Sequence, residues 1–132
     1  MNKTRYKLLV KKILIIIFSL ISFNCFAVDK STTFTVEKFD KAQSQGKIVV
    51  INSWNETCYT CEKQVKILNE AEKDFTGIMF LSFEQQKDKE VAKLLGIKYW
   101  TTIVIYKNNK EIYRSIGQTK KSKIYSTISN LT

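Results

Sequence analysis

Two cysteines separated by two residues, Cys58 and Cys61, are the residues in this sequence best suited to chemistry. Thiols at this spacing on the first turn of a helix can close a small disulfide and open it again. The apolar run 47–54 before them is typical of a buried strand, and the run after them is typical of a helix. At a helix N-terminus, free backbone N–H groups and the helix dipole stabilise a thiolate. The pattern therefore indicates thiol chemistry.

Two other uses of the cysteine pair stay open. A purely structural disulfide would close a loop of only four residues, which removes little conformational entropy from the unfolded chain. Half of a zinc site would need further ligands, and the sequence has no histidine and no second cysteine pair, so only a site shared between two copies would suffice. We predict neither a metal nor a cofactor.

Residues 1–27 have the pattern of an export signal. Basic residues without any acid precede the apolar stretch 13–23, and small residues at Cys25 and Ala27 follow it. The stretch is shorter than the roughly 20 residues of a membrane-spanning helix. We predict cleavage near Ala27, a mature domain of residues 28–132 without a membrane span, and a periplasmic or secreted location. An uncleaved signal that tethers the protein to the membrane is the alternative, and bulky neighbours argue against a lipid on Cys25.

The net charge of the whole chain is +10, and it falls to +5 without residues 1–27, because that segment holds five basic residues and no acid. The remaining excess is scattered, with one tight cluster at residues 120–123. Without a basic stripe interleaved with aromatic residues, we expect no nucleic-acid binding. The surplus suits solubility and favours acidic partners.

The remaining periodicity predicts alternating strands and helices. Glycine ends three of the predicted helices, at residues 46, 77 and 96, and two asparagines form the turn of the last hairpin. The order predicts an α/β fold of three layers, in which helices cover both faces of a mixed sheet that is parallel early and antiparallel at the last hairpin. Strands are expected at 34–36, 47–54, 78–83, 102–106 and 111–116, and helices at 37–45, 58–75, 87–95 and 120–131.

This element order, with Trp54-Asn-Glu-Thr-Cys58-Tyr-Thr-Cys61 after the first central strand, resembles the thioredoxin superfamily. Members of that superfamily carry W-x-x-x-C-x-x-C at the end of a strand, and later a Gly-Ile, a hairpin, a glycine and a terminal helix. Gly96-Ile97 and Gly117 match the later positions. The resemblance covers about residues 34–131 and implies a thioredoxin-like three-layer fold that exchanges disulfides with protein thiols.

The resemblance also implies roles for individual residues. Cys58 would attack a substrate disulfide to form a mixed disulfide, and the more buried Cys61 would resolve it, leaving the disulfide Cys58–Cys61. Residues between the cysteines would tune the thiolate. An extended peptide would bind in a groove beside the pair. The groove is expected to comprise Trp54, Tyr59, Thr60, Trp100 and Thr101, although Trp54 suits a place in the core equally well.

Three positions depart from the superfamily's pattern. The cis-proline that faces the disulfide falls on Thr101, and a cis bond before a non-proline residue costs about 2.5–4 kcal/mol, so we predict a trans Trp100–Thr101 bond. The buried acid beneath the second cysteine falls on Asn52, which cannot take up a proton, and the lysine near that acid falls on Ser82. Tyr59-Thr60 replaces Gly-Pro. Relatives without the proline are considered prone to take up metal or iron–sulfur clusters, a possibility that the sequence leaves open.

Together these features predict an exported thiol–disulfide oxidoreductase that acts on envelope proteins. Such proteins are oxidants, or reductants fed from the membrane, so a membrane-embedded electron donor or acceptor is expected. The small domain resembles exported reductases, which favours a reductant. Asn52 should slow resolution by Cys61, which predicts long-lived mixed disulfides with one dedicated partner. The alternative is a catalytically weak binding module that holds a partner protein in its groove.

Overall fold

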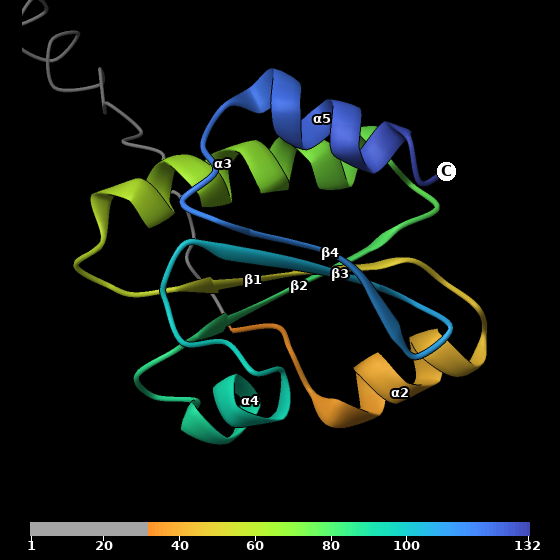
Figure 1. The fold of residues 1–132 in the computed structure, drawn as a ribbon, viewed down its shortest axis with the longest axis horizontal. Helices are drawn as coiled ribbons and strands as arrows, with labels where there is room; N and C mark the ends of the chain where they lie inside the picture. Colours follow the sequence, from red (N-terminus) through yellow and green to blue (C-terminus); the bar gives the residue numbers. More distant parts are fainter. Residues whose placement is uncertain (1–31) are drawn as a thin grey trace, which may run out of the picture.

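A four-stranded sheet with the order β2-β1-β3-β4 forms the middle layer of the computed structural model, which describes residues 32–132 (Figure 1). β1 pairs in parallel with β2 and antiparallel with β3, and β3 and β4 form an antiparallel hairpin. The predicted mixed sheet with helices on both faces is confirmed. The elements in chain order are α2 (Val36–Ser44), β1 (Val49–Trp54), α3 (Tyr59–Asp74), β2 (Met79–Glu84), α4 (Lys89–Leu94), β3 (Thr102–Lys107), β4 (Lys110–Ile116) and α5 (Lys121–Ser129).

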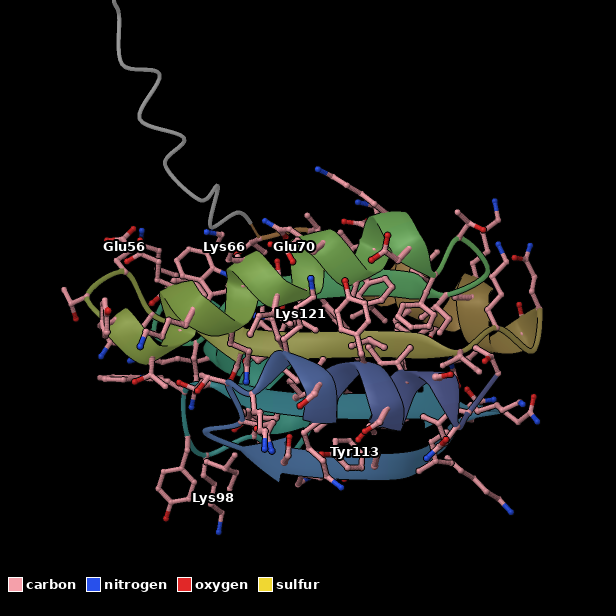
Figure 2. All side chains as sticks on the ribbon, turned by 90° about the horizontal axis from the view of Figure 1, so that it is seen from above. Glu56, Lys66, Glu70, Lys98, Tyr113 and Lys121 are labelled. Atoms are coloured by element: carbon pink, nitrogen blue, oxygen red, sulfur yellow. A yellow bond between two sulfur atoms is a disulfide. The ribbon has the colours of Figure 1, made fainter. Side chains whose placement is uncertain are left out.

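The central strand β1 contributes side chains to the cores on both faces of the sheet. Val49 and Ile51 pack in the core beneath α2 and α4, whereas Val50 packs in the core beneath α3 and α5. All six residues of β1 are buried, which explains why the strand is mostly apolar, with Asn52 and Ser53 as buried polar residues. Figure 2 shows the α3 and α5 layer from above, where Lys121 of α5 pairs with Glu70 of α3 at 2.6 Å.

The predicted strand at 34–36 is wrong. The N–H groups of Thr33 and Phe34 both donate to the carbonyl of Ser82, but no ladder continues from there. Val36 instead begins α2, because Thr35 is an N-cap whose hydroxyl accepts a hydrogen bond from the Lys38 N–H at 3.2 Å. The capping preference of threonine outweighed the β-branched composition of this short segment.

The expectation of parallel crossovers holds for β1 and β2 but is wrong for β3. The connection between β2 and β3 carries only the six-residue helix α4, about 9 Å long, whereas a six-residue strand is about 20 Å long. The chain therefore stays at the end of the sheet where β2 finishes. There Glu84 pairs with Trp54, and Thr102 pairs with the adjacent Ser53 to start β3 in the opposite direction.

The predicted turns are confirmed where the backbone must adopt a left-handed conformation. Gly46 and Gly96 follow α2 and α4 with φ of 69° and 59°, and Asn108 and Asn109 turn the β3–β4 hairpin with φ of 51° and 60°. No helix within residues 32–132 is long and apolar enough to cross a membrane. The predicted export signal, its cleavage site and Cys25 lie outside the described residues.

Arg114 of β4 ties the sheet to the segment that follows α4. Its guanidinium donates to the carbonyls of Leu95 at 2.8 Å and Gly96 at 3.2 Å, and it pairs with Glu111 at 2.7 Å. The hydrogen bonds from Arg114 lower the pKa of Glu111 below its ordinary value. The loop that begins at Gly96 ends at Thr101, which lies beside the cysteine pair, so this contact stabilises a segment next to the candidate site.

We expect Arg114→Met to lower the free energy of unfolding by about 2 kcal/mol, because it removes charged hydrogen bonds to two carbonyls. The share that comes from the Glu111 pair is complete at neutral pH and disappears as the pH falls through the lowered pKa of Glu111. Urea unfolding at pH 7 and at acidic pH measures both. Lys110→Met, on the exposed start of the same strand, is the matched control and should change stability by less than about 0.5 kcal/mol.

Candidate active site

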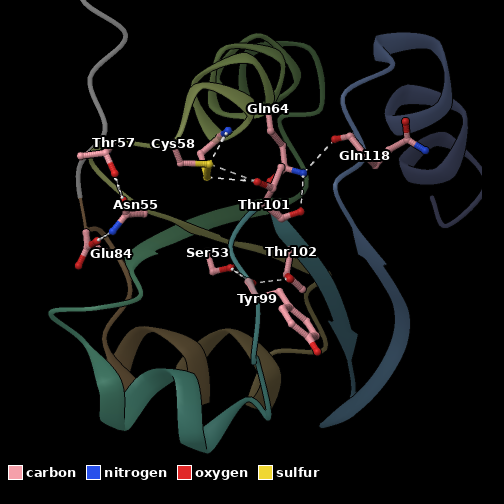
Figure 3. Close-up of a disulfide and its surroundings, with 11 residues drawn as sticks. Ser53, Asn55, Thr57, Cys58, Gln64, Glu84, Tyr99, Thr101, Thr102 and Gln118 are labelled. Carbon is pink, nitrogen blue, oxygen red and sulfur yellow. Dashed lines mark hydrogen bonds between the residues drawn. A yellow bond between two sulfur atoms is a disulfide. The ribbon is translucent and has the colours of Figure 1, made fainter.

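Cys58 and Cys61 lie at the N-terminal end of α3, after the loop that follows β1. They form a disulfide with their Cα atoms 5.2 Å apart (Figure 3). Cys58 is the N-cap of α3, and its Sγ accepts a hydrogen bond from the Cys61 N–H at 3.1 Å. Cys58 is half-buried, whereas Cys61 in the first helical turn is completely buried. One sulfur therefore lies near solvent at a helix N-terminus and the other lies behind it.

A groove of about 680 Å³ opens beside Cys58. Of the five residues predicted to form a substrate groove, four lie along it: Tyr59, Thr60, Trp100 and Thr101. Large aromatic surfaces face solvent here, since Tyr59 is 70 % exposed and Trp100 is 40 % exposed. The structure adds residues that the sequence did not indicate, namely Lys98, Tyr99 and Gly117. An exposed aromatic groove next to a thiol suits a protein segment with apolar side chains.

The placement of Trp54 in this groove is wrong. Its side chain is 4 % exposed and packs with Cys61 and Val65 beneath α3. The alternation of β1 explains the difference, because Trp54 has the same parity as Val50 and Asn52 and therefore points to the α3 face. Trp54 forms part of the apolar wall around the buried sulfur.

Thr101 stands directly against the disulfide. The described residues contain no cis peptide bond, so the Trp100–Thr101 bond is trans. Thr101 nevertheless has φ of 57°, a left-handed conformation that is uncommon for a β-branched residue. Its hydroxyl oxygen lies 3.2 Å from Cys61 Sγ and 3.5 Å from Cys58 Sγ. Dashed lines in Figure 3 mark the contacts between Thr101 and the disulfide. The position where the superfamily has proline thus presents a hydroxyl to both sulfurs.

Asn52 is buried on the α3 face of β1, opposite Ser82 of β2 in the strand register. Its side-chain nitrogen has no hydrogen-bond partner within the described part of the chain. It borders a cavity of about 90 Å³ between the sheet and α3, which is lined by apolar residues as well as by Asn69 and Glu72. A neutral amide thus occupies the position at which the superfamily carries a proton acceptor.

A buried acid that the sequence interpretation missed supports the loop before Cys58. Glu84, 2 % exposed at the end of β2, accepts hydrogen bonds from Asn55 Nδ2 at 2.9 Å and from the Lys87 N–H at 2.6 Å. Asn55 Oδ1 in turn accepts from the N–H and the hydroxyl of Thr57. An acid at the end of an apolar strand was the available signal, but the partner that links it to the loop before Cys58, Asn55, lies 29 residues away in the sequence.

Replacement of Glu84 by glutamine should lower the free energy of unfolding by about 2 kcal/mol, because an amide N–H₂ would face a donor and a charged hydrogen bond would be lost. Glu56→Gln makes the same chemical change in an exposed ion pair with Lys87 and should have little effect. Chemical unfolding of both variants checks this. Equal stabilities for the two variants would contradict a supporting role for Glu84.

Gln64 is a second buried polar residue that the sequence interpretation missed. It is completely buried one turn after Cys61, on the face of α3 that meets the loops around the groove. Its Nε2 donates to the carbonyl of Thr101 at 3.1 Å and to that of Gln118 at 2.9 Å. A glutamine in a helix gives no sequence signal of such a bridge. Within residues 32–132, no group of three or more His, Cys, Asp or Glu side chains has the arrangement of a metal site.

Comparisons with known proteins agree with this geometry. A thioredoxin H-type from Fagopyrum esculentum is 28 % identical over 89 residues, which cover 67 % of this chain and 77 % of that protein. A thioredoxin from Mycoplasma genitalium is 24 % identical over 96 residues, which cover 73 % of this chain and 94 % of that protein.

Solved structures share the fold at low sequence identity. The crystal structure of Trxlp from Edwardsiella tarda superposes with a TM-score of 0.67 at 21 % identity, over 71 % of this chain and 93 % of that one. The family model described as Thioredoxin matches residues 30–130, which is most of the sequence. The chain therefore belongs to the thioredoxin family, and its Cys58–Cys61 pair supports a thiol–disulfide oxidoreductase.

Proposed function

We propose that this protein is an exported thiol–disulfide oxidoreductase that reduces disulfides of envelope proteins through Cys58 and Cys61. The observation that carries the proposal is the asymmetry of the pair. Cys58 caps α3 at the edge of an open aromatic groove, whereas the side chain of Cys61 is completely buried behind Cys58. A purely structural disulfide needs neither the groove nor a first sulfur that is partly exposed, and a link across four residues gives little stability.

The geometry supports a two-step exchange. In the reduced protein the Cys58 thiolate attacks a substrate disulfide, forms a bond to one substrate sulfur and releases the other as a thiolate. The Cys61 thiolate then attacks Cys58 Sγ, and the electron pair of the broken bond leaves on the first substrate sulfur. The substrate gains two electrons and two protons, and the protein ends as the disulfide that the structure shows. A membrane-embedded dithiol donor would return the pair to the reduced state.

Export forms a separate part of the proposal, supported by the sequence of residues 1–27. Their basic start, short apolar stretch and small residues before Val28 are typical of a secretory signal. N-terminal sequencing of the protein recovered from a periplasmic or secreted fraction should begin at Val28. Recovery of the intact N-terminus in the membrane fraction would instead support a tethered protein.

Reduction of insulin by dithiothreitol tests turnover. The purified protein should accelerate insulin precipitation above the uncatalysed rate, and a variant with serine at both Cys58 and Cys61 should not. A normally folded protein without any acceleration would contradict an oxidoreductase. That result would favour a binding module, which the replacement of a proton acceptor by Asn52 also suits.

The dedicated partner is testable by trapping. Asn52 has no proton to give up or accept at neutral pH, so resolution by Cys61 should be slow and mixed disulfides should persist. In cells, Cys61→Ser should accumulate one prominent disulfide-linked complex that dithiothreitol dissolves and that depends on Cys58. Capture of no partner would contradict the dedicated-partner proposal without affecting the insulin result.

A further inference from the structure

Thr101 presents a hydroxyl to both sulfurs of the disulfide. Its oxygen lies 3.2 Å from Cys61 Sγ and 3.5 Å from Cys58 Sγ, both within range of a hydrogen bond to sulfur (Figure 3). Thr101 is 5 % exposed, so bulk water competes little for this contact. We propose that Thr101 is a catalytic residue whose hydroxyl, in the reduced protein, donates a hydrogen bond to the Cys58 thiolate and accepts one from the Cys61 thiol. This inference rests on the proposed oxidoreductase function.

The backbone of Thr101 is fixed by contacts that do not involve the disulfide. Its N–H donates to the carbonyl of Ser53 in β1 at 3.0 Å, and its carbonyl accepts from the Gly117 N–H at 2.8 Å. These bonds join Thr101 to the central strand and to the loop after β4. Opening the disulfide breaks neither of them. The hydroxyl therefore remains beside the sulfurs when the pair is reduced.

The left-handed backbone of Thr101 is the second observation. A β-branched residue at φ of 57° is unfavourable and persists only where its surroundings enforce it. Glycine is the residue that adopts this conformation at no steric cost, and the chain uses glycine at 46, 96 and 117. A side chain at position 101 therefore comes with backbone strain. Its hydroxyl contact with both sulfurs offers a functional reason for that strain.

Gln64 acts as a positioning residue for Thr101. Its buried Nε2 holds the Thr101 carbonyl at 3.1 Å and the Gln118 carbonyl at 2.9 Å. Because Gln64 lies on α3 one turn after Cys61, it links the helix that carries the sulfurs to the loop that carries the hydroxyl. Both of its hydrogen bonds go to carbonyl groups and neither goes to a sulfur. Its effect on the sulfurs would pass through Thr101.

The chemical consequence is a stabilised thiolate. A hydrogen bond to an ionised group favours the ionised form, and the thiolate is the form of cysteine that attacks disulfides. The thiolate exists only in the reduced protein, so the same bond also stabilises the reduced state relative to the disulfide. The neutral Asn52 does not replace the acid that the superfamily places beneath the second cysteine. The hydroxyl of Thr101 stabilises the thiolate from the groove side instead. In this role Thr101 only forms hydrogen bonds: it gains no electron and forms no covalent bond.

Four residues at position 101 separate the hydroxyl from the size of the side chain. Thr101→Val keeps the shape and removes the hydroxyl, whereas Thr101→Ser and Thr101→Ala form a smaller pair that also differs only by the hydroxyl. The rate at which iodoacetamide modifies Cys58 in the reduced full-length protein is measured against pH, with mass spectrometry to assign the site. The midpoint should rise by about one pH unit in the valine and alanine variants and stay unchanged in the serine variant, a tenfold change in thiolate below the midpoint.

The outcomes are distinct from those of the insulin assay, because alkylation requires no turnover. A midpoint that follows side-chain size, or one that is the same in all four proteins, would overturn the proposal even if insulin reduction is normal. Should the valine variant not fold, the serine and alanine variants still decide. The reduction potential should become more negative by about 30 mV when the hydroxyl is lost, which is the same tenfold change for a two-electron couple.

Gln64→Met tests the positioning role. It keeps the length of the side chain but removes both donated bonds, so the alkylation midpoint should rise by less than in Thr101→Val. In the double variant the midpoint should equal that of Thr101→Val alone, since Gln64 acts through the hydroxyl. Additive shifts would show that Gln64 influences the thiolate by another route.

Discussion

Replacing Cys58 by serine is expected to reduce catalysed insulin reduction to the uncatalysed rate. A serine hydroxyl is not ionised at neutral pH and does not attack a disulfide, whereas the cysteine at the N-cap of α3 is placed to react as a thiolate. The buried Cys61 cannot take over, because its side chain is completely covered. Turbidity of precipitating insulin over time measures the effect.

Cys61→Ser is the matched control for this experiment. It keeps the attacking sulfur and removes the resolving one, so it should complete the first step and stop at a mixed disulfide. Non-reducing electrophoresis should show a covalent complex with reduced mobility for Cys61→Ser and none for Cys58→Ser. A complex formed equally by both variants would contradict the assignment of Cys58 as the attacking thiol.

Phe83→Ala should have the largest effect on stability. Phe83 of β2 is completely buried and meets Phe34 edge to face with their ring centroids 6.3 Å apart. Removing the ring loses its transfer free energy and leaves a cavity, which together cost about 4 kcal/mol. Domains of this size are stable by only about 5–15 kcal/mol, so a large share of the total is lost. Urea unfolding followed by circular dichroism measures the change.

Leu94→Ala provides the control for Phe83→Ala. Leu94 lies on α4, the helix that covers the same core, but it is 57 % exposed and faces solvent. Its truncation should change the free energy of unfolding by less than about 0.5 kcal/mol. A comparable loss in both variants would indicate that the core beneath α2 and α4 does not limit stability as the packing implies.

The sequence alone predicted the elements that depend on local patterns. The apolar run of β1, the periodic face of α3 and the turns at Gly46 and Asn108 are all encoded within short windows. The predictions were wrong where neighbouring residues favour different structures, or where the result depends on contacts between residues distant in the sequence. The N-cap at Thr35 turned an expected strand into a helix start, and the short α4 reversed the direction of β3.

The candidate site was predictable only in part, because its motif is local and its supports are not. Cys58, Cys61 and the residues between them are adjacent in the chain. Thr101 lies 40 residues from Cys61, and only the resemblance placed it against the disulfide; the contact of its hydroxyl with both sulfurs comes from the structure. Glu84 and Gln64 are buried polar residues that bond to Asn55 and to Thr101, which are distant from them in the sequence, so their roles emerge only from the folded structure.

The same contacts connect the fold to the proposed chemistry. Glu84 and Asn55 hold the loop that delivers Cys58, and Arg114 holds the segment that leads to Thr101. Both supports approach the pair from the sheet, while the groove side stays open to a substrate. Cys58 is therefore held at a fixed position and stays partly exposed at the groove, whereas Cys61 is buried behind it.

The reduction potential of the Cys58–Cys61 pair tests the account most directly. The full-length protein is equilibrated with defined ratios of reduced and oxidised dithiothreitol or glutathione, and the fraction of free thiol is measured. A redox-active pair that serves as a reductant should have a potential near about −270 mV. A potential below about −300 mV would identify a structural disulfide, and one near about −120 mV would identify an oxidant. Either value would contradict a reductant that acts through this pair.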